Sequence, residues 1–176
     1  ELVPDNLRTE ALAEYFEQVQ WKVNDTEEYK QIEIDKEPIS EECAKTNTEN
    51  TTLKELNHAI HKFKNKKTPG PDGVPSELYK WLNLDNRKTL LKHLNECWES
   101  EPLEDTMNDA SLATIYKKGR SDRPENYGPI ALLNVTYKIL AIIIHVRLYE
   151  TIDDRISKTQ FGFRKNKSTA QPLFIY

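Results

Sequence analysis

The sequence predicts an α+β fold that is rich in helix, and two patterns support this prediction. Apolar residues recur at helical spacing in five segments, whereas the alternation typical of strands is confined to residues 111–132. The 176 residues suffice for one domain, and 37% of them are hydrophobic, which is enough for a core. The charged fraction of 31% is high for a compact domain.

The first predicted element is an amphipathic helix over residues 5–20, with Asp5 as its N-cap. Residues 22–50 are acidic, rich in Asn and Thr, and nearly without periodicity, so we interpret them as a linker. Residues 1–50 carry 5 Lys and Arg against 14 Asp and Glu, whereas residues 51–176 carry 20 against 15. We therefore divide the chain into an upstream helix (1–21), an acidic linker (22–50) and a mildly basic domain (51–176).

Three helices are predicted next. The first begins with the capping-box pattern of Thr52 and Glu55 and ends near Lys67, because Pro69 disfavours helix in the residue before it. The second begins near Pro75 and the third after Asn86. Their apolar residues are Leu53, Leu56, Ile60, Phe63, Leu78, Trp81, Leu82, Leu90, Leu91, Leu94 and Trp98.

A hairpin and a long helix complete the domain. One strand runs from Ser111 to Lys117, a charged loop covers residues 118–126, and a second extended piece follows at residues 129–132. Pro129 restricts its strand to a sheet edge or to the start of a strand. Asn134 then caps a helix through about residue 152, which is apolar on most faces and should be the most buried element.

Three short segments combine turn residues with cations. The first, Pro69-Gly70-Pro71-Asp72-Gly73, follows a lysine-rich helix end. Its composition alone favours a plain connector between helices, but its glycines would also let the backbone approach a ligand closely. The second segment places Lys117 and Lys118 at the hairpin tip, where they suit phosphate groups, although a solvated lysine pair is the simpler interpretation.

The third segment is Gln160-Phe161-Gly162-Phe163-Arg164, with Lys165 and Lys167 following. Aromatic rings next to cations suit single-stranded nucleic acid, whose bases stack and whose phosphates pair with positive charge. The alternative is two core phenylalanines beside a solvated basic loop.

Together the three segments resemble the fingers region of reverse transcriptases from LINE-type (non-LTR) retrotransposons. The resemblance covers roughly residues 51–176, and more loosely the helix at 5–20. It implies a right-hand polymerase in which this chain supplies the fingers and the start of the palm, truncated before the catalytic aspartates, which are expected beyond Tyr176. It also implies RNA-directed DNA polymerase (nucleotidyltransferase) activity for the full-length enzyme, with Mg²⁺ as cofactor. We expect the fragment to bind no metal and to be inactive alone.

The resemblance implies four partners: an RNA template, a DNA primer, a deoxynucleotide triphosphate and the remainder of the retrotransposon polyprotein. It implies contacts to template or nucleotide from Lys117, Lys118, Tyr127, Pro129, Ile130, Gln160, Phe161, Gly162, Phe163, Arg164, Gly70, Asp72 and Gly73. We expect the three segments to converge in space around a strand and its next nucleotide.

One departure stands out. The family pattern is Tyr-Arg-Pro-Ile, whereas this chain has Gly128 in place of the arginine, which is thought to contact the triphosphate. Because a hydrogen bond to a charged group contributes about 1.5–3 kcal/mol, we expect nucleotide binding to be weakened roughly ten- to a hundredfold. This substitution suggests a decayed copy of the element.

A helical RNA- or protein-binding module without polymerase activity is the alternative interpretation. The acidic N-terminal region does not resemble a secretory signal, and the longest apolar run is too short to cross a bilayer. Two separated cysteines, Cys43 and Cys97, favour a reducing compartment, so we expect an intracellular protein of the cytoplasm and nucleus with no membrane partner. His58 and His61 lack a third ligand, and we expect Asp153-Asp154 to be a solvated helix end rather than a metal site.

Overall fold

The computed structural model describes residues 5–22, 46–99, 109–168 and 170–174. Its main helices are α1 (Asp5–Tyr15), α2 (Leu53–Lys62), α3 (Ser76–Trp81), α4 (Leu84–Glu99) and α6 (Val135–Ile152). Two strands, β1 (Ala110–Tyr116) and β2 (Tyr127–Leu133), pair as an antiparallel hairpin. Short helical turns cover Phe16–Gln20, Pro124–Asn126, Asp153–Arg155 and Gln171–Phe174. This mixture of helix and strand agrees with the predicted α+β class.

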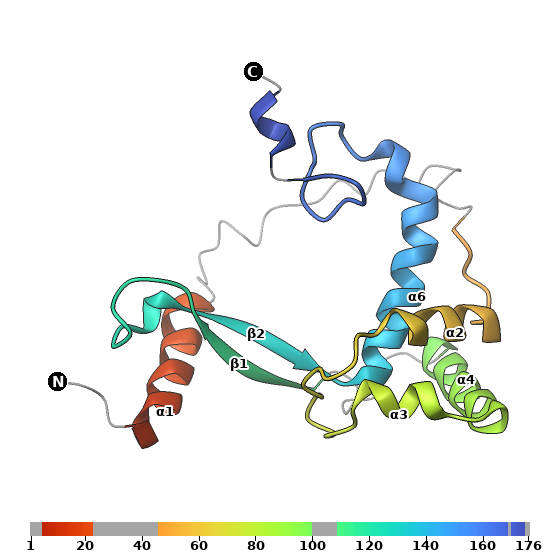
Figure 1. Ribbon diagram of the computed structural model, residues 1–176, viewed down its shortest axis with the longest axis horizontal. Coiled ribbons are helices and arrows are strands. Elements are labelled where there is room, and N and C mark those ends of the chain that lie inside the picture. Colours follow the sequence, from red (N-terminus) through yellow and green to blue (C-terminus); the bar gives the residue numbers. More distant parts are fainter. Residues whose placement is uncertain (1–4, 23–45, 100–108, 169, 175–176) are drawn as a thin grey trace.

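The core lies where α2 and α4 pack with α6, on the right of Figure 1. Its fully buried side chains are Leu56, Ile60, Leu94 and Ile139. Among the described helices, α6 contributes the most buried apolar side chains, as the sequence predicts. The burial is one-sided, however, because Ala141 is exposed and Leu148 retains 42% of its surface. The helix is therefore central to the core without being enclosed by it.

The helix boundaries agree with the sequence at caps and differ where distant residues intervene. The capping box at the start of α2 is present, with the Glu55 amide donating to Thr52 Oγ1 and the Thr52 amide donating to Glu55 Oε2. The helix ends at Lys62 rather than near Lys67, because Phe63 is extended and Lys80 Nζ donates to its carbonyl oxygen over 2.6 Å. The lysine-rich segment after Lys62 is therefore not helical.

The predicted starts of the next two helices differ in accuracy. Pro75 immediately precedes α3, as predicted. By contrast, α4 begins at Leu84, before the predicted start after Asn86. The Asn86 amide donates to Asn83 Oδ1 over 2.9 Å, so Asn83 caps this helix. Both predicted helices are therefore present, but α4 is capped by Asn83 and not by Asn86.

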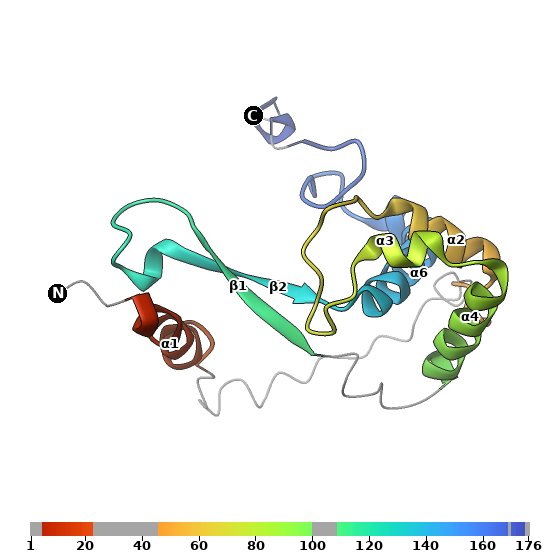
Figure 2. The ribbon, with the colours of Figure 1, turned by 60° about the horizontal axis from the view of Figure 1, so that its bottom comes forward.

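The hairpin is confirmed and projects from the helical body (Figure 2). Tyr116 pairs with Tyr127 next to the loop, and Ala110 pairs with Leu133 at the base. Pro129 sits opposite Thr114 in a sheet of two strands, where each strand is an edge and the missing amide is tolerated.

The N-terminal helix lies against the far end of this hairpin (Figures 1 and 2). α1 covers the first part of the predicted helix, and a π-helical turn, Phe16–Gln20, continues it. The buried Phe16 ring stacks on Trp21, with 5.5 Å between ring centroids. Of the predicted linker, residues 23–45 lie outside the described part of the chain. In the described residues, no helix is long and apolar enough to cross a membrane.

Candidate nucleic-acid interface

The glycine turn joins α2–α3 to the start of α6. Gly73 adopts φ +68° and its amide donates to the Gly70 carbonyl over 3.0 Å, which closes the turn. Gly70 is buried, and a Cβ there would lie 2.5 Å from the backbone N of Asn134. Its close neighbour is therefore the protein's own backbone, and the segment connects α2 with α3 while touching the start of α6.

Asn134 couples the same turn to α6 in a way the sequence did not suggest. It occupies the N-cap position, as predicted, but its side chain makes no capping hydrogen bond. Instead Asn134 Oδ1 accepts a hydrogen bond from the Asp72 amide over 3.2 Å. The Asp72 carboxylate in turn accepts from the Val74 amide over 2.9 Å, so Asp72 is occupied in shaping the turn.

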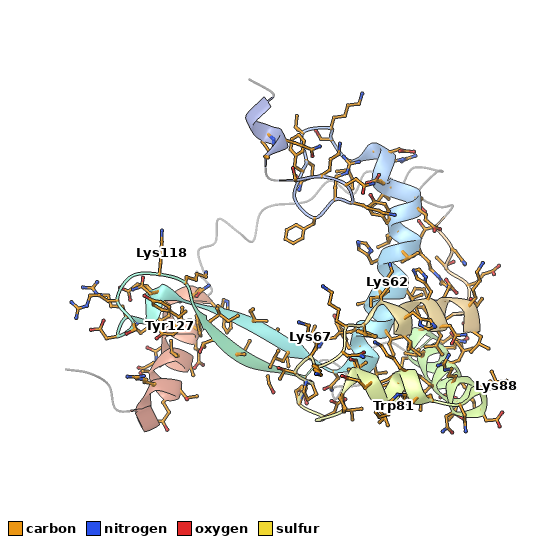
Figure 3. The ribbon with its side chains drawn as sticks, viewed as in Figure 1. Lys62, Lys67, Trp81, Lys88, Lys118 and Tyr127 are labelled. Carbon is orange, nitrogen blue, oxygen red and sulfur yellow. The ribbon has the colours of Figure 1, made fainter. Side chains whose placement is uncertain are left out.

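The hairpin tip presents Lys117 and Lys118, both exposed, at the end of β1. The Lys117 amide donates to the Asn126 carbonyl over 2.8 Å, and the Tyr127 hydroxyl donates to the Ser121 carbonyl over 2.8 Å. The Tyr116 hydroxyl donates to the Gly119 carbonyl in the same loop. These bonds fix the backbone that carries the two lysines, of which Lys118 is labelled in Figure 3.

Two other cations near the tip are already paired. Arg120 forms a bidentate ion pair with the Asp122 carboxylate, at 2.6 and 3.1 Å, and Arg123 pairs with Glu125 at 3.3 Å. The Arg120 guanidinium holds the pKa of the Asp122 carboxyl below its usual range. Lys117 and Lys118 are thus the tip cations best placed for an external anion.

Gly128 lies buried beneath the Lys117 side chain. A Cβ at this glycine would lie 2.8 Å from Lys117 Nζ, so the lysine ammonium occupies the space next to the position where the family pattern has arginine. Pro129 and Ile130 follow on β2, where Ile130 is 47% exposed. Of the contact residues predicted in this segment, Lys117 is the one that packs against Gly128.

The third segment forms a bend held by Arg164. Its guanidinium donates to Asp153 Oδ1 over 3.1 Å, to the Asp153 carbonyl over 2.8 Å and to the carbonyls of Ile156 and Ser157 over 3.3 and 3.2 Å. The Arg164 side chain is only 12% exposed. Arg164 therefore anchors the bend to the end of α6, and Asp153 is its partner rather than a solvated carboxylate.

The aromatic residues of the bend differ in environment. Lys167 Nζ lies 5.9 Å from the centre of the half-buried Phe161 ring, within the range of a cation–π contact. Phe163 is fully exposed and adopts φ +62°, so the left-handed residue is Phe163 and not Gly162. Gln160 Nε2 donates to the Gly162 carbonyl over 3.2 Å. The bend thus contains one exposed ring and the exposed cations Lys165 and Lys167, which are features that suit a single-stranded nucleic acid.

The three segments do not meet at one point, which corrects the expected convergence. The glycine turn lies at the base of the hairpin, the lysine tip at its far end and the bend at the opposite end of α6 (Figure 1). A seven-residue strand spans about 20 Å and an 18-residue helix about 27 Å. The segments are therefore spread along one continuous scaffold of hairpin and helix.

The most extensively bonded side chain, Arg147, was missed by the sequence reasoning. It is 6% exposed, and every N–H of its guanidinium donates: two to Glu55, at 2.7 and 3.0 Å, and the others to the carbonyls of Asn47, Glu49 and Asn50. It also lies over the Trp98 ring at 5.5 Å. The available signal was its position on the buried face of α6, four residues after Ile143.

Arg147 gives the stability of the domain a pH dependence. Its hydrogen bonds lower the pKa of Glu55 from 4.5 to about 2. A depressed carboxyl pKa adds stability above the unfolded pKa, and that stability is lost as pH falls toward the folded pKa. We expect the free energy of unfolding to drop by about 2 kcal/mol between roughly pH 5 and pH 2, after allowance for solvent screening. Urea titrations should show this drop, and Glu55→Gln should largely abolish it.

The described residues do not provide a metal site. In that part of the chain, no group of three or more His, Cys, Asp or Glu side chains is placed to hold a metal ion. His58 and His61 on α2 belong to no such group.

The chain is similar to proteins of retrotransposons. It is 29% identical over 109 residues to the "Transposon TX1 uncharacterized 149 kDa protein" of Xenopus laevis, which covers 62% of this chain and 8% of that protein. It is 31% identical over 123 residues to the "Retrovirus-related Pol polyprotein from type-1 retrotransposable element R1" of Bradysia coprophila, which covers 66% of this chain and 12% of that protein. The chain spans about a tenth of the length of these relatives. No protein-family model matches it. These similarities support an origin in a LINE-type (non-LTR) retrotransposon.

Proposed function

We propose that this chain is the template- and nucleotide-contacting fingers region of an RNA-directed DNA polymerase, a reverse transcriptase. The similarity to the R1 Pol polyprotein is the observation that carries the proposal. The projecting hairpin supports it, because its fixed tip presents two exposed lysines to an external anion. The chain's partners in this proposal are an RNA template, a DNA primer, a deoxynucleotide triphosphate and the rest of a retrotransposon polyprotein.

We assign binding and positioning to this chain. Lys117 and Lys118 contact phosphates, and the exposed Phe163 with Lys165 and Lys167 contacts a single strand. The metal-dependent formation of the phosphodiester bond belongs to other parts of the polymerase. The reaction takes place where the element's RNA is found, in the cytoplasm and nucleus.

The lysine tip gives the first test. We expect Lys117→Gln combined with Lys118→Gln to weaken binding of a fluorescent single-stranded oligouridylate about tenfold, because two phosphate contacts are lost. Fluorescence anisotropy over a salt series should also show a shallower dependence of log affinity on log salt, by about 1.4, since each single-strand phosphate contact contributes about 0.7.

Lys88 and Lys92 provide a matched control. They lie on α4, their side chains are 62% and 79% exposed, and Lys88 is remote from the hairpin (Figure 3). Lys88→Gln with Lys92→Gln removes the same charge and should leave affinity within about twofold of wild type. If the wild-type chain binds no RNA at any salt concentration, the alternative of a helical protein-binding module is favoured instead. Equal losses in both variants would remove the hairpin tip from the proposal.

A further inference from the structure

A shallow groove lies between the end of α2 and one face of α6. It has a volume of about 380 Å³ and is lined by Lys62, Phe63, Lys138, Ala141, Ile142 and His145. Figure 3 shows Lys62 beside α6 and Lys67 between α6 and the hairpin. We call this feature the α2–α6 groove. None of its residues belongs to the sites predicted from sequence.

The lining of the α2–α6 groove combines apolar and basic residues. Phe63, Ala141 and Ile142 are apolar, and we call them the floor; Lys62, Lys138 and His145 are basic, and no carboxylate lines the groove. Within the described part of the chain, neither Lys62 nor Lys138 has an ion-pair partner. Apolar side chains next to cations suit a ligand that combines a flat ring with a nearby negative charge, such as a nucleotide with its base and phosphate.

A larger hollow beside the groove shows the contrast. It measures about 840 Å³ and also lies along α6, but its cations Lys54, Arg147 and Arg155 share the lining with Glu55, Glu150 and Asp154. Its positive charge is therefore balanced by carboxylates, which would repel phosphates. Size alone does not select the site, and the charge of the lining points to the smaller groove.

The α2–α6 groove is continuous with the bend at the end of α6. Lys138, Ile142, His145 and Tyr149 follow one another at helical spacing on one side of the helix. The His145 ring stacks on Tyr149, with 5.8 Å between centroids. Tyr149 forms a hydrogen bond with Asp153, the residue that Arg164 also contacts. Burial and this hydrogen bond raise the pKa of Tyr149. From Lys138 to Tyr149 this face extends about 16 Å.

We propose that the α2–α6 groove binds single-stranded RNA, with phosphates at Lys62 and Lys138 and a base over Phe63 and Ile142. The strand continues along His145 and Tyr149 to the basic bend. This inference rests on the proposed function and adds a second contact region far from the hairpin tip. A body contact and a tip contact hold an RNA at two separated points, which a single site at the tip would not do.

Two variants test the groove in the complete chain. Lys62→Gln with Lys138→Gln should weaken binding of the fluorescent oligouridylate about tenfold and reduce the salt dependence by about 1.4. Ala141→Glu places a carboxylate on an exposed position of the floor and should weaken binding about as much, without removing any buried contact. Lys88→Gln with Lys92→Gln is again the charge-matched control, and circular dichroism verifies that each variant is folded.

The outcomes separate this inference from the proposed function. If both groove variants bind like wild type while the tip variant loses affinity, the groove is not an RNA site and the proposed function stands. If wild-type chain binds no RNA, both proposals fail. If polyglutamate of matched charge competes as well as unlabelled oligouridylate, the groove is a general anion surface and the assignment to RNA is overturned.

Discussion

Replacing Arg147 with alanine is expected to lower the free energy of unfolding by about 3–5 kcal/mol, which is the cost of removing one partner of a buried ion pair. The Glu55 carboxylate would lose the guanidinium that it contacts at 2.7 Å, and the carbonyls of Asn47, Glu49 and Asn50 would lose their donor. Urea denaturation followed by circular dichroism measures the change. A domain of this size has a total stability of about 5–15 kcal/mol, so this loss would be a large fraction of it.

An exposed arginine provides the comparison for Arg147. Arg123 pairs with Glu125 at 3.3 Å, and both side chains are about half exposed, at 57% and 48%. Arg123→Ala should change the free energy of unfolding by less than about 1 kcal/mol, as is usual for exposed pairs. Similar effects of the two substitutions would contradict the role assigned to Arg147.

Gly70→Ala is the second substitution with a large expected effect. The added Cβ would lie 2.5 Å from both the Asn134 nitrogen and the Leu133 carbonyl carbon, and backbone atoms cannot rotate away as side chains can. Overpacking of this kind costs about 1–3 kcal/mol, and the turn must also move from the start of α6. We expect a lower midpoint in thermal unfolding, together with a broader distribution of distances between spin labels on the hairpin tip and α4.

Gly162→Ala is the matched control for Gly70. A Cβ there would meet only Gln160 Nε2 at 3.6 Å, an ordinary contact, and Gly162 is exposed without a positive φ. Its stability should stay within about 0.5 kcal/mol of wild type. An equal loss in both variants would show that loss of glycine flexibility, and not the contact with Asn134, dominates at Gly70.

Local signals predicted most of the fold correctly. The capping box of Thr52 and Glu55, the alternation of residues 111–116 and the apolar run after Asn134 each describe neighbours in sequence, and the corresponding elements are present. The predicted end of α2 was wrong because Lys80, from the next helix, donates a hydrogen bond to the Phe63 carbonyl. Such a contact between separate elements leaves no mark on periodicity.

The site was harder to predict because basic residues that are neighbours in the sequence have different roles in the structure: one holds the fold together and the other faces solvent. Arg164 and Lys167 share one basic cluster in the sequence, yet Arg164 is bonded to Asp153 and Lys167 is exposed. The order of the three segments in the sequence did not show how far apart the hairpin and α6 would place them. The prediction that the segments converge in space was therefore wrong. The α2–α6 groove joins residues from two helices and needed the packing of both to be found.

The hairpin projects about 20 Å from the contact between Gly70 and Asn134 at its base. Because of this length, a rotation of about 10° about the base would correspond to a displacement of about 3–4 Å at the tip, which is comparable to the length of a hydrogen bond. The position of the two terminal ammonium groups therefore depends both on the close contact at the base and on the packing of α1 against the far end.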